Sequence, residues 1–244
     1  MIKAMSEVFQ RLKTFLINPS DQDLHTERMK HEYPEVARSL HAIAQTIWLD
    51  PSSTKRKIAT AFALGESIGV TSAHVVENWE NFTYLHLTAQ GAKHPVPLSE
   101  PFIFLGPQNP KIIDAHANFL DFAIFHIPKG ARLSPIVEWR RPSVDEKVFC
   151  LGFPPPENKS QTLYRKPAII AGTVVDIDGE SIQIHPDLIT IRPEGTSGGP
   201  VVDAQGRLLG VQVAFDPRIR DIYATTAQTI STTLLKLHNG GQFK

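Results

Sequence analysis

Cysteine is nearly absent from this chain of 244 residues, which contains only Cys150. One cysteine cannot form a disulfide within the chain, so no such bond holds the fold. Cys150 lies in an apolar stretch at residues 148–152. We therefore expect a buried and unreactive thiol there, because reactive cysteines need a setting that favours the thiolate.

The chain also lacks an excess of charge of either sign. Its 25 Lys and Arg residues balance 25 Asp and Glu residues, so no net field favours nucleic acid or a membrane surface as a partner. Hydrophobic residues make up 41% and charged residues 20% of the sequence, as in an ordinary soluble globular protein. We therefore predict neither a nucleic-acid nor a membrane partner.

Long hydrophobic runs are missing as well. No uninterrupted apolar stretch approaches the roughly 20 residues of a membrane-spanning helix, and the first residues lack the apolar core of a secretory signal. We therefore predict a cytoplasmic protein, with leaderless export left open. The ten histidines are scattered, without a His-Glu-x-x-His motif or a cysteine pair, so we predict no metal and no cofactor.

The first fifty residues have a helical texture. Apolar residues recur at helical spacing between Met5 and Leu16, which predicts an amphipathic helix. Pro34 suits the first turn of a further helix, whose apolar face would comprise Val36, Leu40, Ile43, Ala44 and Ile47. We assign residues 1–50 to an N-terminal helical extension and residues 51–57 to a linker. The extension would either pack against the rest of the chain or dock a regulatory partner.

Residues 58–244 have the texture of a β protein. Short runs rich in β-branched and aromatic residues alternate with Gly, Pro, Asn and Asp, and no long helical pattern intervenes. The expected strands are residues 58–64, 68–72, 83–87, 122–127, 147–151, 168–177, 181–184 and 208–215. This pattern predicts an antiparallel sandwich or barrel system, followed by a helix at residues 229–237.

The strongest chemical signal is the sequence Gly-Thr-Ser-Gly-Gly-Pro at residues 195–200. Glycines beside Ser197 allow the backbone to turn tightly and to aim N–H groups into one small space. An acyl-transfer enzyme needs such donors, because negative charge develops on the substrate oxygen in the transition state. We expect the N–H groups of Gly195 and Ser197 to form this oxyanion hole, although a plain glycine-rich turn would have a similar sequence.

His74 and Asp121 are the candidate partners of Ser197. His74 follows a predicted β-hairpin, and Asp121 leads into a predicted apolar strand. An aspartate at the edge of the core can orient an imidazole and stabilise its protonated form. Each residue also has an ordinary alternative, since the histidine could be structural, the aspartate could cap a turn, and Asp114 is a rival for its role.

Together these sequences resemble the trypsin-like serine protease family. Thr-Ser-Ala-His at residues 71–74 is similar to the family's Thr-Ala-Ala-His, and Leu-Asp-Phe-Ala-Ile at residues 120–124 is similar to its Asp-Ile/Leu-Ala-Leu. Residues 195–200 match its Gly-Asp-Ser-Gly-Gly-Pro at all but one position. Later sequences resemble bacterial members of the high-temperature-requirement type, so the resemblance covers about residues 58–237.

The resemblance implies a fold and a mechanism. The fold would be two antiparallel six-stranded β-barrels of the chymotrypsin type, divided near residues 130–145, with the active site in the cleft between them. Ser197 would attack a peptide carbonyl and form an acyl-enzyme, His74 would act as general base and then as general acid, and Asp121 would hold the imidazole tautomer. The chain would thus be a serine endopeptidase that acts on a protein or peptide substrate.

The sequence departs from the family at several positions. Thr196 replaces the aspartate that pairs with a newly cut N-terminus in animal trypsins, so activation by such a cleavage is not expected. Val213 stands where relatives carry a Ser or Thr that supports the triad aspartate. Ile191 stands where trypsin has the aspartate that selects Lys or Arg, and Phe215 falls on the wall of the same pocket. A substrate pocket lined by Ile191, Val213 and Phe215 would favour small or apolar side chains.

Two other interpretations belong to different classes. Gly-x-Ser-x-Gly sequences at residues 65–69 and 195–199 also fit the nucleophile elbow of α/β-hydrolases. That elbow needs a helix after the serine, which Pro200 and the β-rich residues that follow it oppose. The remaining alternative is a latent or non-catalytic protease-fold protein that acts by binding a partner, and an intact triad argues against it.

Overall fold

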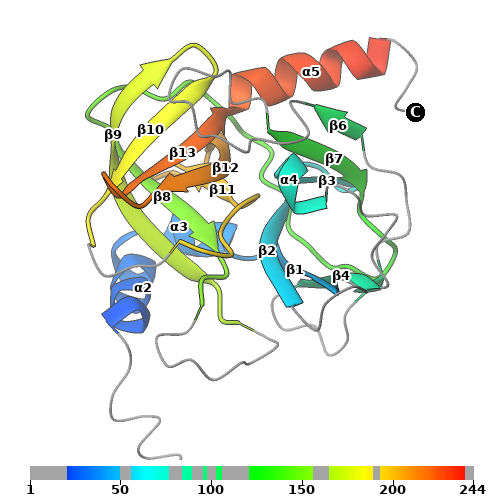
Figure 1. The fold of residues 1–244 in the computed structure, drawn as a ribbon, viewed down its shortest axis with the longest axis horizontal. Coiled ribbons are helices and arrows are strands. Elements are labelled where there is room, and N and C mark those ends of the chain that lie inside the picture. The colour runs from blue at the N-terminus through cyan, green and yellow to red at the C-terminus, as the bar shows by residue number, and fades with distance from the viewer. Residues whose placement is uncertain are drawn as a thin grey trace, which may run out of the picture.

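Two β-rich lobes make up the described part of the chain. The computed structural model describes residues 21–49, 56–76, 84–89, 96–97, 103–105, 121–155, 165–188 and 193–239. The first lobe is a seven-stranded antiparallel sheet, and the second is a closed six-stranded barrel (Figure 1). Among the described residues, no helix is both long enough and apolar enough to cross a membrane.

The sheet of the first lobe is buried on both faces at its inner strand β7, residues 122–126. Its strands are, in spatial order, β5 (Val96–Pro97), β4 (Tyr84–Ala89), β1 (Ile43–Leu49), β2 (Arg56–Ala63), β3 (Ile68–Thr71), β7 (Phe122–His126) and β6 (Ile103–Leu105). Side chains of a strand point alternately to the two faces of its sheet. In β7, Phe122 and Ile124 join one apolar cluster, whereas Ala123 and Phe125 join another. Two covered faces explain why this strand is a continuous apolar run.

The second lobe is a closed barrel. Its strands are, in order around the barrel, β10 (Ser181–Pro186), β13 (Asp221–Thr226), β12 (Leu208–Asp216), β11 (Pro200–Val202), β8 (Lys147–Gly152) and β9 (Ala168–Asp178). Apolar side chains from all six strands fill it, namely Val148, Cys150, Ile170, Val174, Ile182, Ile184, Val201, Leu209, Ile222 and Ala224. The prediction that Cys150 is buried is confirmed. Burial raises the pKa of its thiol to about 12, so the thiol stays protonated near neutral pH.

The predicted mainly β, antiparallel fold is confirmed, and one closed six-stranded barrel is present. A second complete barrel is not confirmed, because the described strands of the first lobe form an open order that ends at β5 and β6. Both of these strands are short and lie between segments that the structure does not describe. Two complete barrels therefore stay a prediction.

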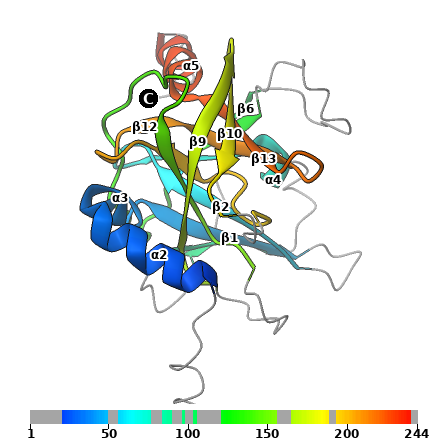
Figure 2. The same ribbon diagram turned by 90° about the vertical axis from the view of Figure 1, so that its left-hand side faces the viewer.

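Two N-terminal helices pack against the barrel. These are α2 (Asp21–Glu32) and α3 (Pro34–Ser39), and α2 lies across strand β9 (Figure 2). Met29, Val36 and Leu40 are at most 3% exposed and belong to the main apolar core. The described part of the extension is thus a packed layer. The helix predicted between Met5 and Leu16 lies outside the described residues.

The helix predicted to run from Pro34 through Ile47 is wrong beyond Ser39. Ile43–Leu49 instead forms strand β1, which pairs with β2 and β4. Residues 43–47 are all buried, with at most 5% exposure, so the strand lacks the polar alternation that marks a half-buried strand. The sheet therefore begins within the predicted extension, and β2 begins at Arg56, within the predicted linker.

A short helix and a long one complete the described elements. Helix α4 (Ala73–Val76) follows β3, and helix α5 (Ala227–Asn239) follows β13 and packs against the barrel (Figure 1). The predicted C-terminal helix is confirmed. The sequence at residues 65–69 comprises the turn between β2 and β3 and the first residues of β3, and the Leu64 N–H donates to the Ile68 carbonyl at 2.9 Å. It is therefore not a nucleophile elbow.

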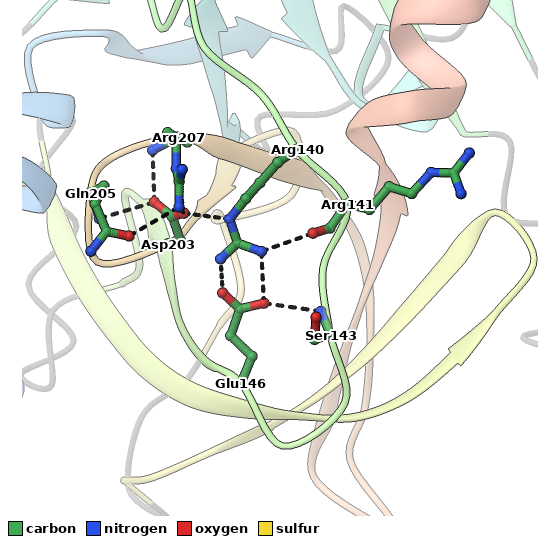
Figure 3. A network of polar contacts seen from close by, with 7 residues as sticks. All are labelled: Arg140, Arg141, Ser143, Glu146, Asp203, Gln205 and Arg207. Carbon is green, nitrogen blue, oxygen red and sulfur yellow. Dashed lines mark hydrogen bonds and ion pairs between the residues drawn. The ribbon is translucent and has the colours of Figure 1, made fainter.

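A polar network fastens the segment between the lobes to the barrel (Figure 3). Arg140, in this segment, donates from Nε to Oδ2 of Asp203 at 2.7 Å and pairs with Glu146 through its terminal nitrogens. The Asp203 side chain is 1% exposed and also accepts from Nε of Arg207 at 2.8 Å. Burial alone would raise the pKa of Asp203, but the hydrogen bonds from Arg207 and Arg140 outweigh it and lower the pKa. The network thus anchors the hairpin of β11 and β12.

Candidate active site

His74 and Asp121 form a close pair in the first lobe. Nδ1 of His74 lies 2.6 Å from Oδ2 of Asp121, and the backbone N–H of His74 donates to Oδ1 at 2.9 Å. One residue therefore holds the carboxylate through both of its oxygens. Asp121 is 5% exposed, whereas the His74 side chain is 32% exposed. The pair thus consists of a buried carboxylate and an imidazole that solvent or a substrate can reach.

The pairing of β3 with β7 explains why these two residues meet. The strands are antiparallel, with Thr71 opposite Ala123, so the end of β3 lies beside the start of β7. His74 follows β3 in the short helix α4, and Asp121 immediately precedes β7. Their apposition is a consequence of strand register, which the burial of alternate side chains specifies.

Ser197 lies in the loop that precedes strand β11 of the barrel. The loop begins with a turn in which the Thr196 N–H donates to the Pro193 carbonyl at 3.0 Å. The third residue of this turn, Gly195, has a φ of +90°, as a type II turn requires. The Thr196 hydroxyl donates to the same Pro193 carbonyl at 2.6 Å. Thr196 therefore stabilises the turn through both its N–H and its hydroxyl.

Thr60 of strand β2 binds this loop to the first lobe. Its N–H donates to the Ser197 carbonyl at 2.9 Å, and its hydroxyl donates to the Gly195 carbonyl at 2.8 Å. The same hydroxyl accepts the N–H of Phe153 at 3.2 Å. Thr60 is fully buried, its contact with Phe153 is buried with it, and its contact with the Gly195 carbonyl is partly buried. One threonine thus fixes the carbonyls on both sides of Thr196.

Gly198 brings the loop against the strand that leads to His74. A Cβ atom at this position would overlap the Thr60 carbonyl and the Thr71 hydroxyl, and would lie 2.8 Å from the Ser72 nitrogen. Only a residue without a side chain allows two backbones to approach this closely. The nucleophile candidate therefore neighbours the segment that carries the histidine.

The carbonyl of Gln212 joins the two segments a second time. It accepts the Ser72 hydroxyl at 2.7 Å and the Gly198 N–H at 2.8 Å. These bonds fix the backbone on one side of Ser197, which is itself partly exposed. Among the described contacts, the Ser197 hydroxyl makes no hydrogen bond with His74.

Two backbone donors of the loop are free within the described part of the chain. The N–H groups of Thr196, Gly198 and Gly199 all donate to carbonyls, whereas those of Gly195 and Ser197 have no partner there. The unbonded donors are the two for which the sequence predicts a role in an oxyanion hole. Unpaired N–H groups at a partly exposed site are available to a ligand carbonyl.

The predicted pocket residues lie in different surroundings. Val213 is 5% exposed and belongs to the main apolar core. Phe215 is partly buried and packs against the apolar core of the barrel. Ile191 and the rival aspartate, Asp114, lie outside the described residues. A pocket formed by Ile191, Val213 and Phe215 therefore stays a prediction.

Sequence reasoning missed three residues that hold the site. Thr60 and Gln212 bind the Ser197 loop, and Arg165 contacts it from the segment before β9. A threonine at a buried position of an apolar strand was a weak signal for Thr60, whereas Arg165 stands in a polar stretch without any pattern. In the described residues, no group of three or more His, Cys, Asp or Glu side chains is placed to hold a metal ion.

The chain matches a known protein family. A family described as "Trypsin-like peptidase domain" matches residues 59–211, more than half of the chain. No curated protein matches the chain in sequence.

Solved structures with the same fold include bacterial proteases. The Rv3671c protease from M. tuberculosis, in its active form, has a TM-score of 0.61 at 19% identity, over 85% of this chain and 86% of that chain. A serine endoprotease from Yersinia pestis has a TM-score of 0.61 at 16% identity, over 86% of this chain and 67% of that chain. The HtrA-type protease AlgW with tripeptide has a TM-score of 0.57 at 15% identity, over 85% and 63%. These likenesses establish a shared fold.

Proposed function

The chain belongs to the trypsin-like peptidase family and is a serine endopeptidase, and we propose that Ser197, His74 and Asp121 form its catalytic triad. One observation carries the proposal: His74 is paired with a buried Asp121 in one lobe, beside the glycine-rich Ser197 loop of the other lobe. The substrate is a protein or a peptide, as membership of the family implies.

The bond between His74 and Asp121 sets the tautomer of the imidazole. A carboxylate oxygen 2.6 Å from Nδ1 accepts a hydrogen bond, so Nδ1 carries the proton and Nε2 presents its lone pair. Nε2 can then take the proton of the Ser197 hydroxyl as its oxygen attacks the substrate carbonyl carbon. The resulting imidazolium is stabilised by the Asp121 carboxylate, which stays ionised.

The attack forms a bond between Oγ of Ser197 and the carbonyl carbon, and the π electrons of the carbonyl move onto its oxygen. We place this oxyanion between the N–H groups of Gly195 and Ser197, the donors without a described partner. The imidazolium of His74 then gives its proton to the amine nitrogen as the C–N bond breaks. A water molecule, deprotonated by His74, hydrolyses the acyl-enzyme and regenerates Ser197.

Asp121 is supported from within its own lobe. At the position where relatives carry a supporting Ser or Thr, this chain has the apolar Val213, which cannot donate a hydrogen bond. The backbone N–H of His74 supplies a donor to Oδ1 instead, at 2.9 Å. Buried carboxylates need such donors, because an unpaired charge in the interior is costly. This contact supports the assignment of Asp121 despite the departure at residue 213.

Labelling with a fluorophosphonate probe tests the triad. The wild type should form a covalent adduct, and Ser197→Ala and His74→Ala should lower the labelling rate by at least about 1,000-fold, as expected when a triad member is lost. Ser67→Ala is a matched control, because Ser67 stands in the other Gly-x-Ser-x-Gly sequence, in the turn after β2. This variant should label at the wild-type rate.

Two results would contradict the proposal. Labelling that survives Ser197→Ala would place the nucleophile elsewhere. A folded wild type that never labels would favour the alternative, a latent or non-catalytic protein that acts by binding a partner.

A further inference from the structure

Arg165 contacts the loop of Ser197 from the segment that leads into β9. Its Nη1 atom donates to the carbonyl of Phe153 at 3.0 Å and to the carbonyl of Glu194 at 3.3 Å. The same atom fills the space that a Cβ atom on Gly195 would need. Each terminal guanidinium nitrogen carries two N–H groups, so a single nitrogen can bridge these two segments of backbone.

We propose that Arg165 is a positioning residue that keeps the oxyanion hole formed by binding the Glu194 carbonyl, an inference that rests on the proposed function. The described peptide bonds are all trans, and the C=O and N–H of a trans peptide point in opposite directions. Because Arg165 binds the C=O of the peptide between Glu194 and Gly195, the Gly195 N–H points away from Arg165. That N–H has no partner among the described residues.

The turn itself can adopt either orientation of this peptide. Type I and type II turns share the hydrogen bond from the fourth residue to the first, here from Thr196 to Pro193, and differ by a flip of the central peptide. Type II has a positive φ at the third residue, as Gly195 does at +90°, whereas type I has a negative φ there. A flip would replace the Gly195 N–H of the hole with the Glu194 carbonyl. The groups that bind this carbonyl therefore select the orientation.

The surroundings of Arg165 hold it in position to bind the Glu194 carbonyl. Its backbone N–H donates to Oε1 of Gln45 at 3.0 Å, and Gln45 belongs to β1 and is 1% exposed. Burial lowers the pKa of the guanidinium, and the nearby Glu194 carboxylate opposes this effect. The guanidinium remains charged, and hydrogen bonds from a charged donor are stronger than neutral ones. Strand β1 of the first lobe thus holds Arg165, which fixes the orientation of the peptide between Glu194 and Gly195.

Substitution of Arg165 tests the proposal with two independent measurements. In a crystal structure of Arg165→Met, the peptide between Glu194 and Gly195 should be flipped, with a negative φ at Gly195. In peptide hydrolysis, kcat should fall by at least about tenfold with KM within about twofold, because loss of one oxyanion donor costs roughly 10²–10³ in kcat. Arg165→Lys, which can still donate to one carbonyl, should recover part of kcat.

Arg132→Met is the matched control, since Arg132 is an exposed arginine of the segment between the lobes. It should leave both kcat and the φ of Gly195 unchanged. A positive φ at Gly195 in Arg165→Met would overturn the proposal, even if the wild type proved inactive. A flipped peptide with an unchanged kcat would equally overturn it. Failure of the triad would appear separately, as a wild type that does not label at Ser197.

Discussion

At the scale of single residues, the Ser197 loop depends on positions where no side chain fits. Gly195 combines a φ of +90° with a Phe153 carbonyl that would lie 2.6 Å from an added Cβ atom. Gly195→Ala should therefore strain the backbone and displace the turn that presents the N–H of residue 195. We expect kcat/KM for a peptide substrate to fall by at least about 100-fold, as when an oxyanion donor is lost.

Gly130→Ala separates backbone strain from displacement of the loop. Gly130 has a φ of +102°, and nothing lies within 4 Å of an added Cβ atom. This variant should lose about 1 kcal/mol of stability and keep the wild-type kcat/KM. If both alanine variants lost activity equally, the effect at Gly195 could not be assigned to the loop.

The residues of the proposed triad could be predicted from sequence, whereas the residues that hold them could not. Ser197 stands among glycines that a tight loop requires, and His74 and Asp121 each adjoin a recognisable strand. Thr60 and Arg165 act through contacts with residues distant in sequence. Such contacts depend on how the strands pack, so the sequence around each residue does not predict them.

At the scale of elements, helix α2 covers an incomplete edge of the barrel. Strand β9 pairs with β8 from Ala168, but its pairing with β10 begins only at Gly172. On the uncovered stretch, the Ile169 N–H donates to the Thr26 hydroxyl at 3.3 Å, and the Ala171 N–H donates to Nε2 of His25 at 3.5 Å. Unpaired strand edges invite association with other strands, so α2 protects this one.

His25 makes the attachment of α2 sensitive to acid. Burial lowers the pKa of His25 below its ordinary value of 6.5, and Arg28 adds to this effect. A histidine whose pKa is lower in the folded state takes up protons more readily when unfolded, so stability is complete above about pH 6.5 and declines as the pH falls. We expect the thermal midpoint to drop more steeply between pH 7.5 and pH 5.5 in the wild type than in His25→Gln.

The matched control for this experiment is His31→Gln, since His31 is an exposed histidine of the same helix. It should retain the pH dependence of the wild type. The charged groups around His25 are Arg28, Glu32, Lys147 and Asp187. An unchanged slope in His25→Gln would assign the acid sensitivity to these groups instead.

Prediction from sequence succeeded for strands that are bounded by turn residues. It failed for β1, where burial of both faces removes the alternation of polar and apolar residues. Three hairpin turns of the barrel, at residues 179–180, 203–207 and 217–220, contain or adjoin Gly or Asp residues that delimit the strands. Strand β1 begins at Ile43, shortly after helix α3 ends at Ser39, and residues 43–47 are buried on both faces of the sheet. A short apolar run of this kind fits a helix and a strand equally well. Its pairing with β2 and β4 makes it a strand.

At the scale of the whole molecule, the two lobes share hydrogen bonds that also hold the proposed site. The Thr60 hydroxyl bridges the Phe153 N–H and the Gly195 carbonyl across the lobes. Thr60→Val would leave both groups without this partner, at a cost of roughly 1–3 kcal/mol for the buried Phe153 N–H and less for the partly buried Gly195 carbonyl. We expect a lower free energy of unfolding in urea and a reduced kcat.

Thr46→Val provides a comparison within the same sheet. Thr46, in β1, is also fully buried, but its hydroxyl has no hydrogen-bond partner among the described residues. Its replacement by valine removes an unsatisfied polar group, so stability should stay the same or rise. Equal destabilisation by the two variants would show that the interlobe bonds of Thr60 contribute nothing specific.

The division of the proposed triad between the lobes has a consequence for biosynthesis. Histidine and aspartate lie in the first lobe, whereas serine and its loop belong to the barrel, which the ribosome makes later. At roughly 5–20 residues per second, the nucleophile is added on the order of ten seconds after the general base. The barrel closes only when its last strand, β13, has been made. Until β13 has been made, the growing chain has no closed barrel to hold the Ser197 loop beside His74, so we expect no cleavage of neighbouring nascent chains during that interval.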